Sequence, residues 1–139
     1  MDQSDSTMAQ QIARAALAFE QQRTGHVPKS VTVVLSEDTL VITLHGALSP
    51  AETALAQSPG GSAQVREFHR QLFHSSSGPL RQEIKRITGV GVREAAAEAG
   101  TISGTAVHMF TTGALVQVFL LAGCVPAEVW SGRGPGGQP

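Results

Sequence analysis

Two short runs in which apolar residues occupy every second position constrain the fold more than any other feature of this sequence. The first run covers residues 31–35 and the second covers residues 40–44. Successive side chains of a strand point to opposite faces, so each run predicts a strand with one strongly apolar face. Residues 37–39 between them suit a tight turn. We therefore expect an antiparallel hairpin here.

Apolar residues at helical spacing predict several helices around this hairpin. The first is expected over roughly residues 7–23, a third over roughly 63–74, and a last one ends near Thr88. The second begins at Ser49-Pro50-Ala51-Glu52, where serine suits the N-cap, proline the first helical position, and glutamate closes a capping box.

A second hairpin is expected from residues 90–97 and 105–112. Three consecutive alanines at 95–97 weaken the first of these strands, because alanine is a poor β former, and a helix is the rival interpretation there. Two hairpins can form one four-stranded antiparallel sheet with helices packed on one face. The sequence therefore predicts an α+β fold.

The length of 139 residues suits one domain. We place this domain at residues 1–112, followed by an apolar C-terminal extension at 113–130 and a disordered tail at 131–139. Polar residues, a glycine and a proline interrupt the extension, whereas a membrane-spanning helix needs about 20 mostly apolar residues. We expect no transmembrane segment, and a buried or partner-facing role for the extension.

Composition narrows the class of protein. Ten Lys+Arg against eleven Asp+Glu leave a net charge of −1, which disfavours a dedicated nucleic-acid binder. The single cysteine, Cys124, allows no internal disulfide, and we expect it to be an inert buried thiol. The N-terminus lacks the apolar core of a signal peptide, so a cytoplasmic location is expected. No motif predicts a catalytic centre, a cofactor or a metal, since His69 and His74 are five residues apart and do not share a helical face.

Two sets of residues remain as candidate contacts. The first is basic and could meet an anion or an acidic partner, although the interleaved Glu67 and Glu83 equally fit a solvated helix face. It comprises Arg66, Arg70, Arg81, Lys85 and Arg86. The second is apolar and predicts an interface, with a homodimer as the expected assembly. It comprises Leu115, Val116, Val118, Phe119, Leu120 and Leu121.

Several motifs resemble the MpsC-like family of small bacterial proteins. They are the strand entry Pro28-Lys29-Ser30-Val31, the stretch from Gly46 to Glu52, the junction Ile87-Thr88-Gly89-Val90, and the run from Ile102 to Thr111. The resemblance covers roughly residues 8–112. The family is named for a proposed sodium-translocating, membrane-potential-generating system. The resemblance thus implies an accessory partner of a membrane ion-transport complex, peripheral to the inner membrane face, and implies no chemistry.

Three functions follow as hypotheses. The first is a non-enzymatic accessory or interaction domain. The second is a small-ligand-binding or enzymatic domain that uses His45 and His108 of the expected strands, because histidine titrates near physiological pH. The third is a nucleic-acid-binding module, for which the strands carry few aromatic residues that could stack on bases.

Overall fold

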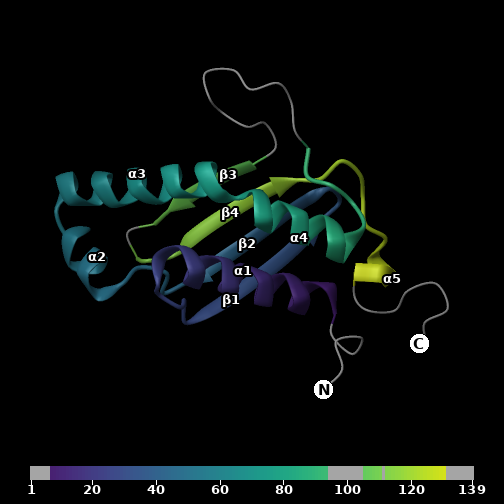
Figure 1. Cartoon of the computed structure of the whole chain (residues 1–139), viewed down its shortest axis with the longest axis horizontal. Helices are drawn as coiled ribbons and strands as arrows, with labels where there is room; N and C mark the ends of the chain where they lie inside the picture. The colour runs from purple at the N-terminus through teal and green to yellow at the C-terminus, as the bar shows by residue number, and fades with distance from the viewer. Residues whose placement is uncertain (1–6, 94–104, 111, 131–139) are drawn as a thin grey trace.

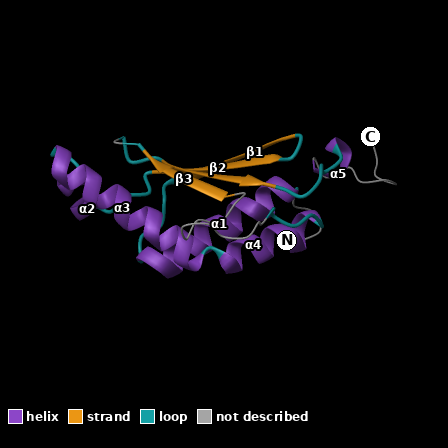
Figure 2. Ribbon diagram, turned by 90° about the horizontal axis from the view of Figure 1, so that it is seen from above, coloured by secondary structure: helices purple, strands orange, loops and turns teal. Residues whose placement is uncertain are grey.

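A four-stranded antiparallel sheet with its long helices on one face organises the structure (Figure 1; Figure 2). The computed structural model describes residues 7–93, 105–110 and 112–130. In chain order the elements are α1 (Met8–Thr24), β1 (Ser30–Ser36), β2 (Thr39–His45), α2 (Pro50–Leu55), α3 (Pro59–Ser76), α4 (Gly78–Thr88), β3 (Thr105–Met109), β4 (Leu115–Leu120) and α5 (Ala127–Trp130). The strand order is β1-β2-β4-β3, and the expected α+β fold is confirmed.

The hairpin of β1 and β2 forms as its alternation predicts. Its strands pair in register from Ser30↔His45 to Ser36↔Thr39, which leaves two residues in the turn. Glu37 in this turn has φ 57°, a left-handed conformation that two-residue hairpin turns require. The helix-facing positions of β2 are fully buried, so this strand lies at the centre of the core.

The helix boundaries follow local capping chemistry. Thr7 forms a capping box at the start of α1, and Gly25, with φ 77°, ends that helix. Helix α3 starts earlier than expected because Ser58 is its N-cap and Pro59 enters its first turn. This start repeats the serine-proline pattern of α2, although only the α2 start was predicted from that pattern.

The apolar segment expected to extend beyond the domain instead supplies β4, an inner strand of the sheet. Strand β4 pairs with β2 on one side and with β3 on the other. The hairpin partner of β3 is therefore this segment, and in place of the strand expected over 90–97 the structure has an isolated bridge between Val92 and Leu121. Residues 94–97 of that expected strand and the tail at 131–139 lie outside the described residues.

The core lies between the sheet and helices α1, α3 and α4. Its buried apolar residues come from every layer: Ile12, Ala16 and Phe19 of α1, Leu40, Ile42 and Leu44 of β2, Val65 and Phe73 of α3, Leu80 and Ile84 of α4, and Leu115 and Phe119 of β4. The rings of Phe73 and Phe119 pack with centroids 5.7 Å apart, which joins α3 to the sheet. Among the described residues, no helix has the length and hydropathy needed to cross a membrane.

Candidate functional site

The long helices of the described chain all lie on one face of the sheet, and the strand residues of the other face include no Asp, Glu, Lys or Arg among those described (Figure 2). We call this surface the open face. Its described strand side chains are Ser30, Thr32, Val34 and Ser36 of β1, Thr39, Val41, Thr43 and His45 of β2, His108 of β3, and Val116, Val118 and Leu120 of β4. One-sided antiparallel sheets usually place polar residues outward. This sheet places valine and leucine side chains there alongside its serine, threonine and histidine residues.

A row of valines crosses the open face. Val34 pairs with Val41, and Val41 pairs with Val118, so the three side chains lie side by side on neighbouring strands. Val34 is 51% exposed. At the end of β3, Phe110 is 48% exposed and packs edge-on against His108, with ring centroids 4.6 Å apart. Apolar side chains gathered on one exposed surface are typical of a protein contact.

The structure divides the predicted apolar interface into two sets. Leu115, Phe119 and Leu121 are buried in the core of this chain, with 2%, 0% and 0% exposure. Val116, Val118 and Leu120 alternate with them and lie half-buried on the open face. A partner can therefore reach only the second set, because side chains of one strand alternate between its faces.

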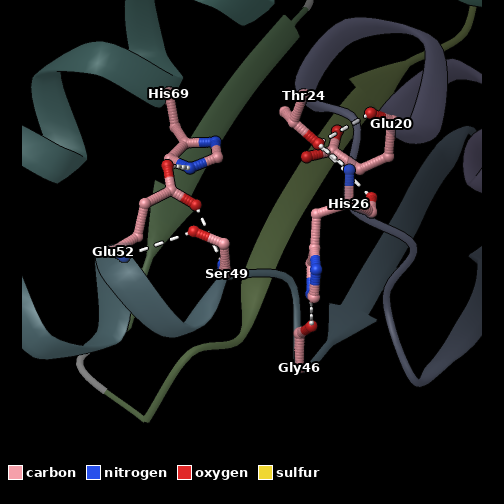
Figure 3. Close-up of polar contacts among 7 residues, drawn as sticks. All are labelled: Glu20, Thr24, His26, Gly46, Ser49, Glu52 and His69. Carbon is pink, nitrogen blue, oxygen red and sulfur yellow. Dashed lines mark hydrogen bonds and ion pairs between the residues drawn. The ribbon is translucent and has the colours of Figure 1, made fainter.

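A second candidate site is a buried polar cluster where α1, α2 and α3 approach the sheet (Figure 3). His69 of α3 is 3% exposed, and its Nε2 lies 2.9 Å from Oε2 of Glu52. The other oxygen of Glu52 accepts a hydrogen bond from the backbone N–H of Ser49, and the Ser49 hydroxyl accepts one from the backbone N–H of Glu52. The capping box predicted from the sequence is confirmed, and its glutamate also holds α3.

Glu20 of α1 is the most perturbed acid of this region. It is 3% exposed, and its Oε2 has no hydrogen-bond partner among the described residues. Burial raises the pKa of the Glu20 carboxyl from 4.5 to about 7; the Arg23 guanidinium opposes this shift, Glu52 adds to it, and His26 opposes it. Glu20 is therefore poised to bind a proton near neutral pH.

Glu20 was not among the predicted site residues, although the sequence carries a signal for it. Glu20 follows Ile12, Ala16 and Phe19 at the spacing of the buried stripe, so it occupies a core position of α1. A carboxylate at such a position predicts a raised pKa. The pairing of His69 with Glu52 had no such signal, because 17 residues separate them.

The space inside this cluster limits its chemistry. A cavity of about 10 Å³ lies between Glu20, His69 and Gln117. A volume of about 10–15 Å³ is the minimum for one water molecule. His26 is occupied on the far side of the cluster, where its Nε2 lies 3.0 Å from the carbonyl oxygen of Gly46 (Figure 3). The cluster can hold a proton, but it has no room for an organic substrate.

The five predicted basic residues do not form one surface. Arg66 and Arg70 of α3 line a groove beside β3, whereas Arg81 and Lys85 of α4 line a separate hollow of about 320 Å³ next to Val92. Arg70 and Arg86 are held in ion pairs along their own helices. Arg70 bonds to Glu67, and Arg86 bonds to Glu83. This matches the interleaved charges of a solvated helix face.

The strand histidines lie on the open face and belong to separate contacts. His45 Nε2 lies 3.0 Å from the Thr32 hydroxyl, and His108 packs against Phe110. In the described part of the chain, no group of three His, Cys, Asp or Glu residues could hold a metal ion. Cys124 is exposed, which corrects the expected buried thiol, because it lies in the loop between β4 and α5.

Comparisons with known proteins agree with the resemblance seen in the sequence. A family model described as "Na+-translocating membrane potential-generating system (MpsC)" matches residues 4–113. The uncharacterized protein YbcI of Bacillus subtilis (strain 168) is 24% identical over 110 residues, which cover 79% of this chain and 89% of that protein. No solved structure matches. The family match ends just before β4.

Proposed function

Because this chain belongs to the MpsC family, we propose that it is a non-enzymatic accessory domain of a membrane ion-transport system. The observation that carries the proposal is the valine row Val34–Val41–Val118 on a sheet face whose described strand residues include no Asp, Glu, Lys or Arg. Burying apolar surface is the main favourable term in most protein associations. The partner we propose is a subunit of that membrane system.

The chemistry of the open face defines the contact that this partner must offer. A face without Asp, Glu, Lys or Arg gives little electrostatic steering, so the partner must present an apolar surface that is complementary to the valine row. His108 and Phe110 offer an aromatic pair at the β3 edge of this surface, and aromatic residues are enriched at interfaces. We place the domain in the cytoplasm, peripheral to the inner membrane face, and we propose that it acts as a homodimer.

The proposal is tested by capturing partners from detergent-solubilised membranes of the native host, with the recovered proteins identified by mass spectrometry. Val118→Lys places a charge in the valine row. Val27→Lys is the matched control, because Val27 is 49% exposed in the loop before β1. Circular dichroism spectra of both variants check that the fold is retained.

We expect the wild-type chain and Val27→Lys to recover an ion-transport membrane subunit, and Val118→Lys to lose it. A charge buried at an apolar contact is strongly unfavourable, which gives the expected loss. Equal recovery by both variants would assign the contact to another surface. Recovery of no membrane subunit by any of the three chains would contradict the accessory function itself.

A further inference from the structure

The outer edge of β1 lacks the features that usually protect an edge strand. Among the described residues, strand β1 pairs with β2 on one side only, and it is the first strand in the order of the sheet. Its seven residues, Ser30–Ser36, include no charge and no proline. Natural edge strands are commonly short, charged, bulged or covered, because their free N–H and C=O groups otherwise pair with another chain. The opposite edge strand, β3, has five residues.

The core is also less complete along β1 than elsewhere. On β2 the helix-facing residues Leu40, Ile42 and Leu44 are each 0% exposed. The corresponding residues of β1, Val31, Val33 and Leu35, are packed against this core but only half-buried. A further strand beside β1 would cover these three side chains.

Opposite charges stand at the two ends of this strand. Lys29 precedes β1 and Glu37 follows it, and both side chains are exposed. Neither has an ion-pair partner in the described part of the chain. In an antiparallel pairing of two identical strands, the residue before one strand lies opposite the residue after the other. Lys29 and Glu37 are therefore placed to attract each other across a two-fold axis.

We propose that two copies of this chain pair antiparallel through β1, with Val33 on the two-fold axis, to form a continuous eight-stranded sheet. This is β-strand addition with a second copy as the added strand. In this register Ser30 lies opposite the partner's Ser36, Val31 opposite the partner's Leu35, and Thr32 opposite the partner's Val34. The proposal rests on the homodimer of the proposed function and names its surface.

The charges select this register over its neighbours. A shift by one residue would turn the apolar side chains of β1 to the opposite face relative to the partner strand. A shift that moves the axis to residue 32 or 34 places Lys29 opposite residue 35 or 39, which are leucine and threonine. Centring on Val33 pairs all seven residues and satisfies both charges twice, once on each side of the axis.

Charge exchange tests this dimer in solution. Sedimentation equilibrium over a concentration series gives the dimer dissociation constant of wild type, Lys29→Glu, Glu37→Lys and the double exchange. Each single variant turns two attractive pairs into two repulsive ones, and we expect the constant to rise about 10- to 30-fold. The double exchange restores the attraction with reversed signs, so we expect it to recover the wild-type constant. Lys85→Glu, an exposed site on α4, controls for the change in net charge.

A second measurement reports the register directly and does not depend on the charges. In a background with Cys124→Ser, Thr32→Cys and Val34→Cys chains are mixed and oxidised mildly. We expect the mixture to form a cross-linked dimer and each variant alone to form much less, because residue 32 lies opposite the partner's residue 34.

The possible failures separate the two proposals. A wild-type dimer that neither single charge variant weakens, and that gives no cross-link in the mixture, overturns pairing through β1 but leaves a homodimer through another surface. A chain that is monomeric at all concentrations overturns the homodimer altogether. The capture experiment with Val118→Lys tests binding of a membrane subunit to the open face, and its outcome does not depend on either dimer measurement.

Discussion

Substitution of Glu20 by glutamine should remove a pH-dependent loss of stability. The pKa of Glu20 is about 7 in the folded chain, against 4.5 as its ordinary value. The folded state therefore holds a proton over a range in which the unfolded chain has released it. Stability must fall as pH rises between these two values, since stability falls wherever the folded state binds more protons.

The magnitude follows from the size of the shift. At about 1.4 kcal/mol for each pH unit, a shift from 4.5 to about 7 corresponds to about 3 kcal/mol of stability lost once Glu20 is fully ionised. Below pH 4.5 this loss is absent, and above pH 8 it is complete. Glutamine has the same shape and no charge, so the free energy of unfolding of Glu20→Gln should lack this dependence.

Urea unfolding followed by circular dichroism, at pH values from 4 to 8.5, measures the effect. The quantity to compare is the stability of Glu20→Gln minus that of wild type, which should rise by about 3 kcal/mol from the lowest to the highest pH.

Glu67→Gln is the control for loss of a carboxylate. Glu67 lies exposed on α3, where hydrogen bonds from Arg70 lower its pKa, so its contribution to the pH profile has the opposite sign. Parallel profiles for wild type and Glu20→Gln would refute the reasoning, because they would show that burial does not hold a proton on Glu20.

Three further outcomes are expected from urea unfolding. Deletion of residues 113–139 should abolish cooperative folding, because it removes β4 from between β2 and β3; a folded product with a shifted assembly state would contradict this. Phe119→Ala should lower the free energy of unfolding by about 3–5 kcal/mol, since Phe119 is 0% exposed and packs on Phe73. Ser49→Ala should lower it by about 1 kcal/mol through loss of the α2 N-cap, and an unchanged midpoint would assign the cap no energetic role.

Features encoded in neighbouring residues could be predicted from the sequence. The alternation over residues 31–44 specifies the first hairpin, because the two faces of a strand differ by a period of two. Ser49 and Glu52 specify the start of α2, and Gly25 and Gly89 specify the ends of α1 and α4, because caps and left-handed positions depend on one or two side chains. Together these signals were sufficient for the α+β class.

The position of β4 could not be predicted in this way. Val116, Val118 and Leu120 are as apolar as the core residues that alternate with them, so the run has no period from which a strand could be recognised. Contacts between distant parts of the chain determine that β4 pairs with β2 and β3. As a result, the expected extension of the domain is an inner strand of its sheet.

The properties of the candidate sites were decided by tertiary structure for the same reason. The pKa of Glu20 depends on how much water the surrounding elements remove, and its neighbour Glu52 is 32 residues away in the sequence. The pairing of His69 with Glu52 and the valine row of the open face also join separate elements. Local patterns determine which elements form, but burial, pKa and surface chemistry depend on which of these elements become neighbours.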